Sequence, residues 1–235
     1  MRKRVFSVLF ALIFLLPAST ALASLTIDFE VLAGSGSGGG SIEFQNITTG
    51  LVGTDIEVDR VSLVPGGPSI NLTGGSLNFQ TGPIDTYDQT NKIWSFLGNG
   101  SLEITGDLVG DGEGSMTLMK GTWKSAKVVA SGEDTVDLAL VFGYFTDEKN
   151  AWLLYKLGLI SDPGDTSTFE GPFDGLLHIS FAMDPDTFNE EYGYFYSDYI
   201  LSGDVDNTYV PIPGAVWLLA SGVLCLVGVR RKFRK

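Results

Sequence analysis

Hydrophobic and polar residues alternate along most of the region between residues 24 and 209. In its first run, at 24–31, Leu25, Ile27, Phe29 and Val31 share one face, as a half-buried strand requires. Similar runs occupy residues 42–47, 56–64, 76–79, 102–109, 116–119, 122–129, 136–145, 151–157, 176–183 and 192–201. Glycine-rich turns separate many of them, and none has a helical apolar period. The pattern predicts one all-β domain, an antiparallel β-sandwich or barrel-like fold of about 11–12 strands.

The N-terminal segment, 1–23, has the three parts of a secretory signal peptide. Residues 2–4 are basic, residues 5–16 are apolar, and Ala21 and Ala23 provide the small residues of a cleavage site. We expect the Sec translocon and signal peptidase to process it, and the mature chain to begin near Ser24.

The C-terminal segment, 210–235, also has three parts. A proline-containing motif at 210–213 precedes 16 uncharged residues at 214–229 and a basic tail of Arg230, Arg231, Lys232, Arg234 and Lys235. A helix over 214–229 would be about 24 Å long, slightly short of the roughly 30 Å hydrocarbon core, so we expect one marginal transmembrane helix. Basic residues flank both apolar segments, which by the positive-inside rule places residues 24–209 outside the cytoplasm.

The order of these C-terminal parts resembles the PEP-CTERM sorting signal of Gram-negative bacteria, in its Val-Pro-Leu-Pro-Ala-like variant. The residues that carry the resemblance are Val210, Pro211, Ile212, Pro213, Trp217, Ser221, Gly222, Gly228 and the basic tail. Ile212 stands between the prolines in place of glutamate. The resemblance implies recognition by an exosortase, a membrane-embedded cysteine protease-transpeptidase. It also implies anchoring in the inner membrane before processing, and then transfer to the cell surface or extracellular polysaccharide. The alternative is a plain C-terminal anchor that is never processed.

The charge of the central region narrows the range of partners. Seven of the 15 basic residues and all 28 acidic residues lie between 24 and 209, so this region has a net charge of −21. Such a charge repels nucleic acid, which we exclude as a partner, and attracts divalent cations or cationic partners. The single cysteine, Cys225, lies in the tail, so no disulfide stabilises the domain.

Candidate catalytic residues are scarce. His178 is the only histidine, and strand alternation places it on the face opposite Leu177 and Ile179, as a structural residue. Paired carboxylates could hydrolyse glycosides, but among 28 acids the sequence singles out no pair. We therefore assign no catalytic residue and no cofactor.

Two sets of residues suggest binding. Calcium could be held by hard oxygen ligands from either of two acidic groups: Asp107, Asp111 and Glu113, or Asp184, Asp186, Asp204 and Asp206. Tyr192, Tyr194 and Tyr196 would project from one face of a strand, where they could stack on sugars or simply fill the sheet. The sequence thus favours an exported non-enzymatic surface or matrix protein. The alternative is an extracellular carbohydrate- or calcium-binding module, or a glycan hydrolase, with a membrane anchor.

Overall fold

The computed structural model describes residues 26–31, 39–64, 66–109, 112, 114–131, 138–164, 173–189 and 191–209. These residues belong to one compact unit, Leu25–Val210. The strands are β1 (Thr26–Val31), β2 (Ser41–Phe44), β3 (Val52–Val64), β4 (Ser69–Gln80), β5 (Ile84–Asp88), β6 (Ile93–Leu97), β7 (Ser101–Leu108), β8 (Met116–Ser131), β9 (Leu138–Lys149), β10 (Phe173–Ala182), β11 (Phe195–Ser197) and β12 (Tyr199–Tyr209). Two short helices accompany them, α2 (Ala151–Lys156) and the 3-10 helix η1 (Pro185–Thr187).

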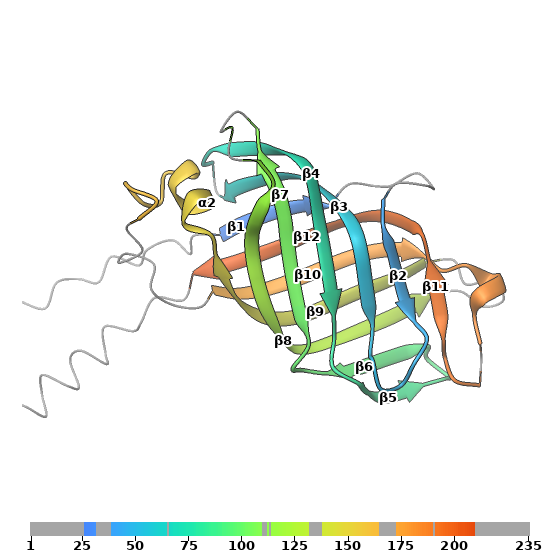
Figure 1. Cartoon of the computed structure of the whole chain (residues 1–235). Coiled ribbons are helices and arrows are strands. Elements are labelled where there is room, and N and C mark those ends of the chain that lie inside the picture. Colours follow the sequence, from blue (N-terminus) through green and yellow to red (C-terminus); the bar gives the residue numbers. More distant parts are fainter. Residues whose placement is uncertain are drawn as a thin grey trace, which may run out of the picture. The chain divides into compact units, whose positions relative to one another are not determined.

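Eight of the strands form a closed antiparallel barrel. They follow one another in the order β1, β12, β10, β9, β8, β7, β4 and β3, and β3 pairs with β1 to close the circuit. In Figure 1, β3, β4 and β7 cross in front of β12, β10 and β9 at a steep angle. The other strands are additions: β2 pairs with β3, β11 with β2, and the β5–β6 hairpin with β8. The prediction of an all-β antiparallel fold is confirmed, and the central part of this fold is a closed barrel.

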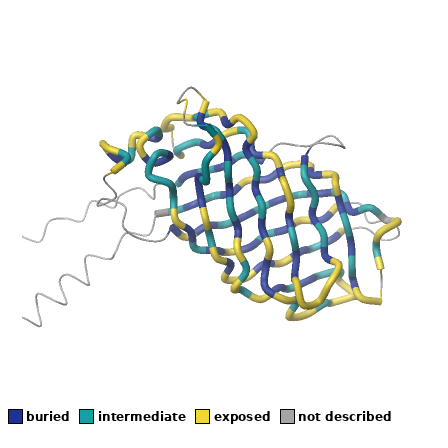
Figure 2. The backbone as a smooth tube through the Cα atoms, viewed as in Figure 1, coloured by how far each residue is buried: buried dark blue, intermediate teal, exposed yellow. Residues whose placement is uncertain are grey.

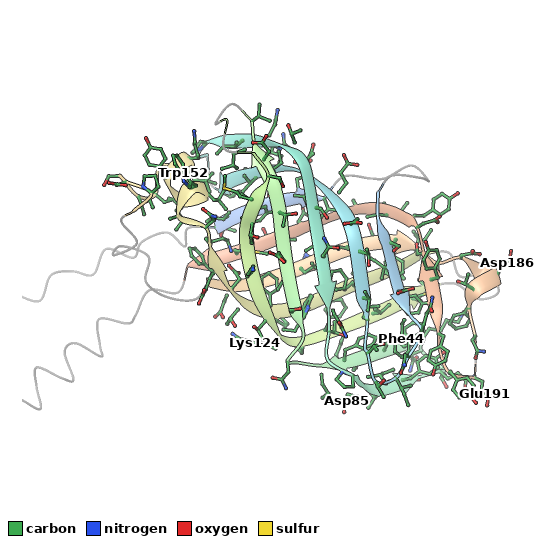
Figure 3. The ribbon with its side chains drawn as sticks, viewed as in Figure 1. Phe44, Asp85, Lys124, Trp152, Asp186 and Glu191 are labelled. Carbon is green, nitrogen blue, oxygen red and sulfur yellow. The ribbon has the colours of Figure 1, made fainter. Side chains whose placement is uncertain are left out.

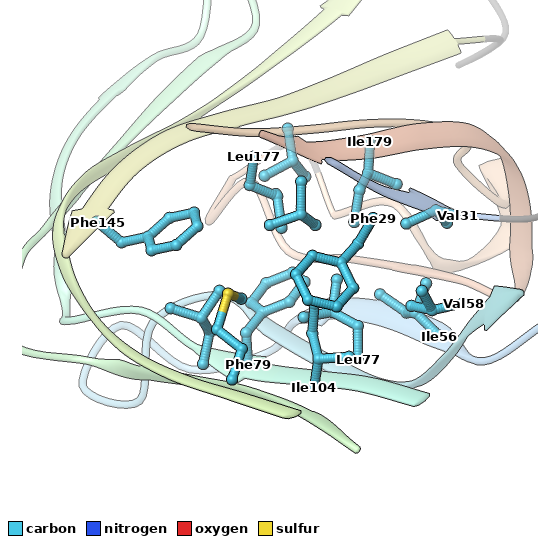
Figure 4. Close-up of a cluster of buried hydrophobic side chains, with 14 of the residues drawn as sticks. Phe29, Val31, Ile56, Val58, Leu77, Phe79, Ile104, Phe145, Leu177 and Ile179 are labelled. Atoms are coloured by element: carbon cyan, nitrogen blue, oxygen red, sulfur yellow. The ribbon is translucent and has the colours of Figure 1, made fainter. Parts of the chain in front are cut away.

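The barrel interior is filled by the apolar side chains of the alternating runs. Buried and exposed residues alternate along the strands in Figure 2, and each strand contributes its inward set to one continuous core. Figure 4 shows part of it, formed by Phe29, Val31, Ile56, Val58, Leu77, Phe79, Ile104, Phe145, Leu177 and Ile179. Burial of these apolar side chains contributes most of the free energy that holds the two crossing halves of the barrel together.

Two glycines make room for large rings in this core. Gly175 is the cross-strand partner of Phe145, and Gly53 is that of Phe79. A Cβ atom added at either glycine would lie only 2.1 or 2.2 Å from the partner ring. Glycine is therefore required at these two positions, because any side chain there would collide with the partner ring.

The structure corrects three element predictions. Residues 151–157 begin with α2 and are not a strand, because the Asn150 side chain accepts a hydrogen bond from the backbone N–H of Trp152 at 2.8 Å and caps the helix. The predicted strands at 116–119 and 122–129 are one long strand, β8, which continues through a bulge between Trp123 and Ser125. The predicted strand at 192–201 is divided between β11 and β12. The predicted transmembrane helix at 214–229 lies outside the described residues.

Candidate functional site

The predicted processing sites lie outside the described residues. This applies to the signal-cleavage residues, the sorting motif and the basic tail: Ala21, Ala23, Val210, Pro211, Ile212, Pro213, Arg230, Arg231, Lys232, Arg234 and Lys235. The strands nearest to these sites are nevertheless described. β1 and β12 are antiparallel neighbours in which Thr26 pairs with Thr208. Among the described residues, no helix has the length and apolarity needed to cross a membrane.

The tyrosines proposed as a glycan platform differ in secondary structure and in exposure. Tyr192 lies in a turn, not on a strand, because β11 begins only at Phe195. The Tyr192 ring is 51% exposed and stacks on Tyr194, with centroids 5.4 Å apart and planes 16° apart. Tyr194 meets the buried Phe44 edge-on at 5.4 Å. Tyr192 alone of these two rings is thus largely open to solvent, while Tyr194 is half-buried against the core.

The third tyrosine belongs to the strand. Tyr196 is half-buried on β11 and is the cross-strand partner of Glu43 on β2. Next to it, the buried Phe195 lies 5.3 Å from the ring of Trp94, whose Nε1 donates a hydrogen bond to the carbonyl oxygen of Gly193 at 2.8 Å. This aromatic cluster holds the 188–195 segment against the β5–β6 hairpin. Figure 3 labels Phe44 on β2 and Glu191 in the segment before β11, both towards this end of the barrel.

His178 lies on the outer face of β10, between the fully buried Leu177 and Ile179, as the alternation predicts. Its cross-strand partners are Asp204 on β12 and Phe142 on β9. It is therefore part of the outer surface, beside the acidic residues of β12.

Four carboxylates on β1 and β12 form a surface that we name the acidic ladder: Asp28, Glu30, Asp204 and Asp206. Asp28 is the cross-strand partner of Asp206, and Glu30 is that of Asp204. Like charges directly opposite each other destabilise an antiparallel pair. Arg60 on β3 forms an ion pair with Glu30 and offsets part of this repulsion.

Two carboxylates of the acidic ladder, Asp28 and Asp206, have raised pKa values. Burial raises the pKa of Asp28 to about 6, and the negative charges of Asp204 and Asp206 add to the effect, while Arg60 opposes it. Burial followed by the charge of Asp204 also raises the pKa of Asp206. The Oδ1 atom of Asp28 is buried and has no hydrogen-bond partner among the described residues. The ladder thus carries more negative charge than its neighbours compensate.

A second charged group lies inside the barrel. The side chains of Asp147 and Lys149 form an ion pair on the inward face of β9, and both are fully buried. The Lys149 Nζ atom lies 4.8 Å from the centroid of the Phe173 ring. Burial raises the pKa of Asp147 to about 6 and lowers that of Lys149 to about 8, although each partner's charge opposes the shift of the other. Within the described ranges, the Oδ2 atom of Asp147 has no hydrogen-bond partner.

The two proposed calcium sets do not form a metal site in the described part of the chain. Asp111 and Glu113 lie outside the described residues. Asp184 accepts a hydrogen bond from the backbone N–H of Asp186 at 2.9 Å, beside η1. Asp204 and Asp206 belong to the acidic ladder instead. Among the described residues, no group of three or more His, Cys, Asp or Glu side chains could hold a metal ion.

A shallow depression of about 490 Å³ adjoins the acidic ladder on the outer surface. Five barrel strands contribute its lining: Thr26, Val64, Tyr144, Asp174, Gly175, Leu176, Asp206 and Thr208. Tyr144 is 57% exposed there, and Asp174 accepts a hydrogen bond from Lys124 Nζ at 2.6 Å. The sequence gives no local signal for this surface, because residues far apart in the chain meet there only when the barrel closes.

The chain matches no known protein-family model, no curated protein and no solved structure.

Proposed function

We propose that this chain is an exported, non-enzymatic protein that a PEP-CTERM-like tail directs to an exosortase-type sorting enzyme. In this proposal the tail helix anchors the protein in the inner membrane of a Gram-negative bacterium until processing. The acidic barrel then becomes part of the cell surface or of the extracellular matrix.

One observation carries the proposal. The first barrel strand begins at Thr26, just after the predicted signal-cleavage site, and the last ends at Tyr209, just before the sorting motif. Loss of 1–23 and of the tail would remove no residue of the barrel's strands. Because β1 and β12 pair with each other, both processing events would leave the sheet closed.

The motif itself has suitable chemistry for a protease substrate. Pro211 and Pro213 lack backbone N–H donors and bias the residues before them towards extended backbone. Proteases act on extended segments, and the following apolar run would hold this one at the membrane surface.

The intact mass of the protein recovered from its native host tests the proposal, measured separately in membrane, surface and medium fractions. We expect the mature mass to lack both the signal peptide and the residues beyond about Pro213. A variant with Pro211→Ala and Pro213→Ala should retain its tail, whereas the conservative control Val223→Leu should be processed normally. Recovery of the wild-type chain with Cys225 and the basic tail still attached would refute sorting and establish a permanent anchor.

A carbohydrate-binding role is the second candidate, and the exposed Tyr192 ring favours it. Stacking of a sugar ring on Tyr192 would give saturable binding to the host's extracellular polysaccharide, and Tyr192→Ala should abolish it. Tyr155→Ala is the matched control, since Tyr155 is an exposed tyrosine on α2. Binding that is absent from the wild-type protein, or unchanged in Tyr192→Ala, would eliminate this role for Tyr192.

A further inference from the structure

The first part of strand β9, from Leu138 to Phe145, is apolar on both of its faces. Ala139, Val141 and Phe145 point into the core and are at most 3% exposed. The alternate positions face outwards and are also apolar, with exposures of 52% for Leu138, 40% for Leu140 and 57% for Tyr144. A strand with one face in water normally carries polar residues on that face. Contiguous exposed apolar surface of this kind marks an interaction site.

The neighbouring strands extend this apolar surface and add positive charge. Val129 and Lys127 on β8 are the cross-strand partners of Leu140 and Phe142, and Leu176 on β10 is the partner of Tyr144. We name the combined surface the β9 strip, formed by Lys127, Val129, Leu138, Leu140, Phe142, Tyr144 and Leu176. Lys124, labelled in Figure 3, lies beside it on β8.

The lysines of β8 are a notable concentration of positive charge in this domain. The region 24–209 has only seven basic residues, and β8 carries three of them, Lys120, Lys124 and Lys127. All three are exposed. Lys120 and Lys124 have acidic partners in Glu103 and Asp174.

The acidic ladder carries negative charge, opposite to that of the β8 lysines. Its opposed carboxylates repel one another, and the part of the chain that the structure describes offers the Oδ1 atom of Asp28 no hydrogen-bond partner. Leu201, 38% exposed, precedes the ladder on β12 and gives it an apolar border. Positive charge brought by a partner would relieve the repulsion, and apolar side chains on that partner would cover Leu201.

The β9 strip and the acidic ladder adjoin each other on the outer surface of the barrel, since Leu176 of the strip is the cross-strand partner of Asp206. Their opposite charges do not meet within one molecule, because strands β9 and β10 lie between Lys127 on β8 and Asp204 on β12. We propose that the β9 strip of one copy of this chain docks on the acidic ladder of a second copy. Such a contact joins two different surfaces, so the first copy keeps a free ladder, the second keeps a free strip, and the assembly can grow into a ring or a fibre. This inference goes beyond the proposed sorting role and does not depend on it.

Charge reversal in the full chain, purified in detergent, tests the contact by sedimentation velocity across a concentration series. We expect the wild-type chain to associate, and Lys127→Glu or Asp204→Lys to weaken association by about tenfold or more, because each places like charges together. The double variant Lys127→Glu with Asp204→Lys restores opposite charges across the contact and should recover association. The matched control is Glu57→Lys, at an exposed position of β3 outside both surfaces, and it should associate like the wild type.

Cross-linking identifies which surfaces meet. In a Cys225→Ser background the chain has no thiol, so Lys127→Cys and Asp204→Cys introduce single cysteines. Under mild oxidation, a mixture of these two variants should form disulfide-linked dimers, and each variant alone should not. Dimers of Lys127→Cys with itself would mean that two strips meet face to face. That result would overturn the proposal, as would a wild-type chain that stays monomeric throughout the series. Retention or loss of the tail in the host changes neither result.

Discussion

Replacing Lys149 by methionine tests whether the buried ion pair is needed for stability. Asp147 would keep its place in the core but lose the hydrogen bond and the counter-charge that Lys149 supplies. Removing one partner of a buried pair costs about 3–5 kcal/mol, since an uncompensated charge remains.

The linkage between protonation and folding adds a pH dependence to this loss. The pKa of Asp147 is about 6 in the folded wild type and the ordinary 3.8 in the unfolded chain, so the wild type already loses stability between these pH values. Without the charge of Lys149, burial raises the pKa of Asp147 further, and each pH unit above about 6 then costs about 1.4 kcal/mol beyond the wild type. Because the unfolded state releases the proton and the folded state keeps it, the stability of Lys149→Met falls as pH rises. A loss of about 3–5 kcal/mol is a large fraction of the 5–15 kcal/mol typical of a domain.

Urea unfolding of the full chain, followed by tryptophan fluorescence at pH 5, 7 and 8, measures both effects. The double variant Asp147→Leu with Lys149→Met removes both charges, so we expect it to recover most of the lost stability and to lose the added pH dependence. Lys124→Met, which breaks an exposed pair, should change the free energy of unfolding by less than about 1 kcal/mol. A Lys149→Met variant with near-wild-type stability and no added pH dependence would refute the reasoning.

Three further predictions concern the acidic ladder and the core. The raised pKa of Asp28 means that its contribution to stability is lost as pH rises from about 4 to about 6. Asp28→Asn should therefore stabilise the protein at pH 7.5 and have little effect at pH 4. The expected gain at pH 7.5 is about 1–2 kcal/mol, because solvent screens part of the charge of this half-buried group. Equal effects at both pH values would contradict this prediction. Gly175→Ala should cost about 1–3 kcal/mol in urea unfolding, because its Cβ would meet the Phe145 ring, and Phe145→Leu in the same chain should reduce that cost; an unchanged midpoint would show that the ring can move away. Trp94→Phe loses the hydrogen bond to Gly193, and we expect faster amide exchange at 188–195 with the rest of the barrel unchanged.

The sequence predicts the strands of the barrel best where one face of the strand is buried and the other is exposed to solvent. The runs in β1, β7 and β10 alternate over their whole length, and the structure confirms them as strands. The hairpin β5–β6 was not predicted, because β5 has no buried residue and so no apolar period. Helix α2 was misassigned because a short apolar run has no clear period of its own, although Asn150 before it is a typical helix-capping residue.

The candidate surfaces were much harder to predict than the strands. Asp204 and Asp206 were singled out as acids, but their pairing with Glu30 and Asp28 depends on closure between the first and last strands. The apolar outer face of β9 can be read in its sequence, since Leu138, Leu140, Phe142 and Tyr144 occupy alternate positions. What the sequence does not give is which neighbours surround those positions, because strand order is a long-range property.

Closure of the barrel by β1 and β12 also sets the order in which the protein can finish folding. A chain that is synthesised and translocated from its N-terminus can pair β1 with β3 early, whereas β12 is the last strand to emerge. Until Tyr209 is available, both β1 and β10 present an unpaired edge, and exposed edges are templates for aggregation. A chain truncated before β12 would therefore leave two open edges at once, so we expect quality control to remove such fragments. If the chain is exported as proposed, its translocation would have to be nearly complete before the sheet could close.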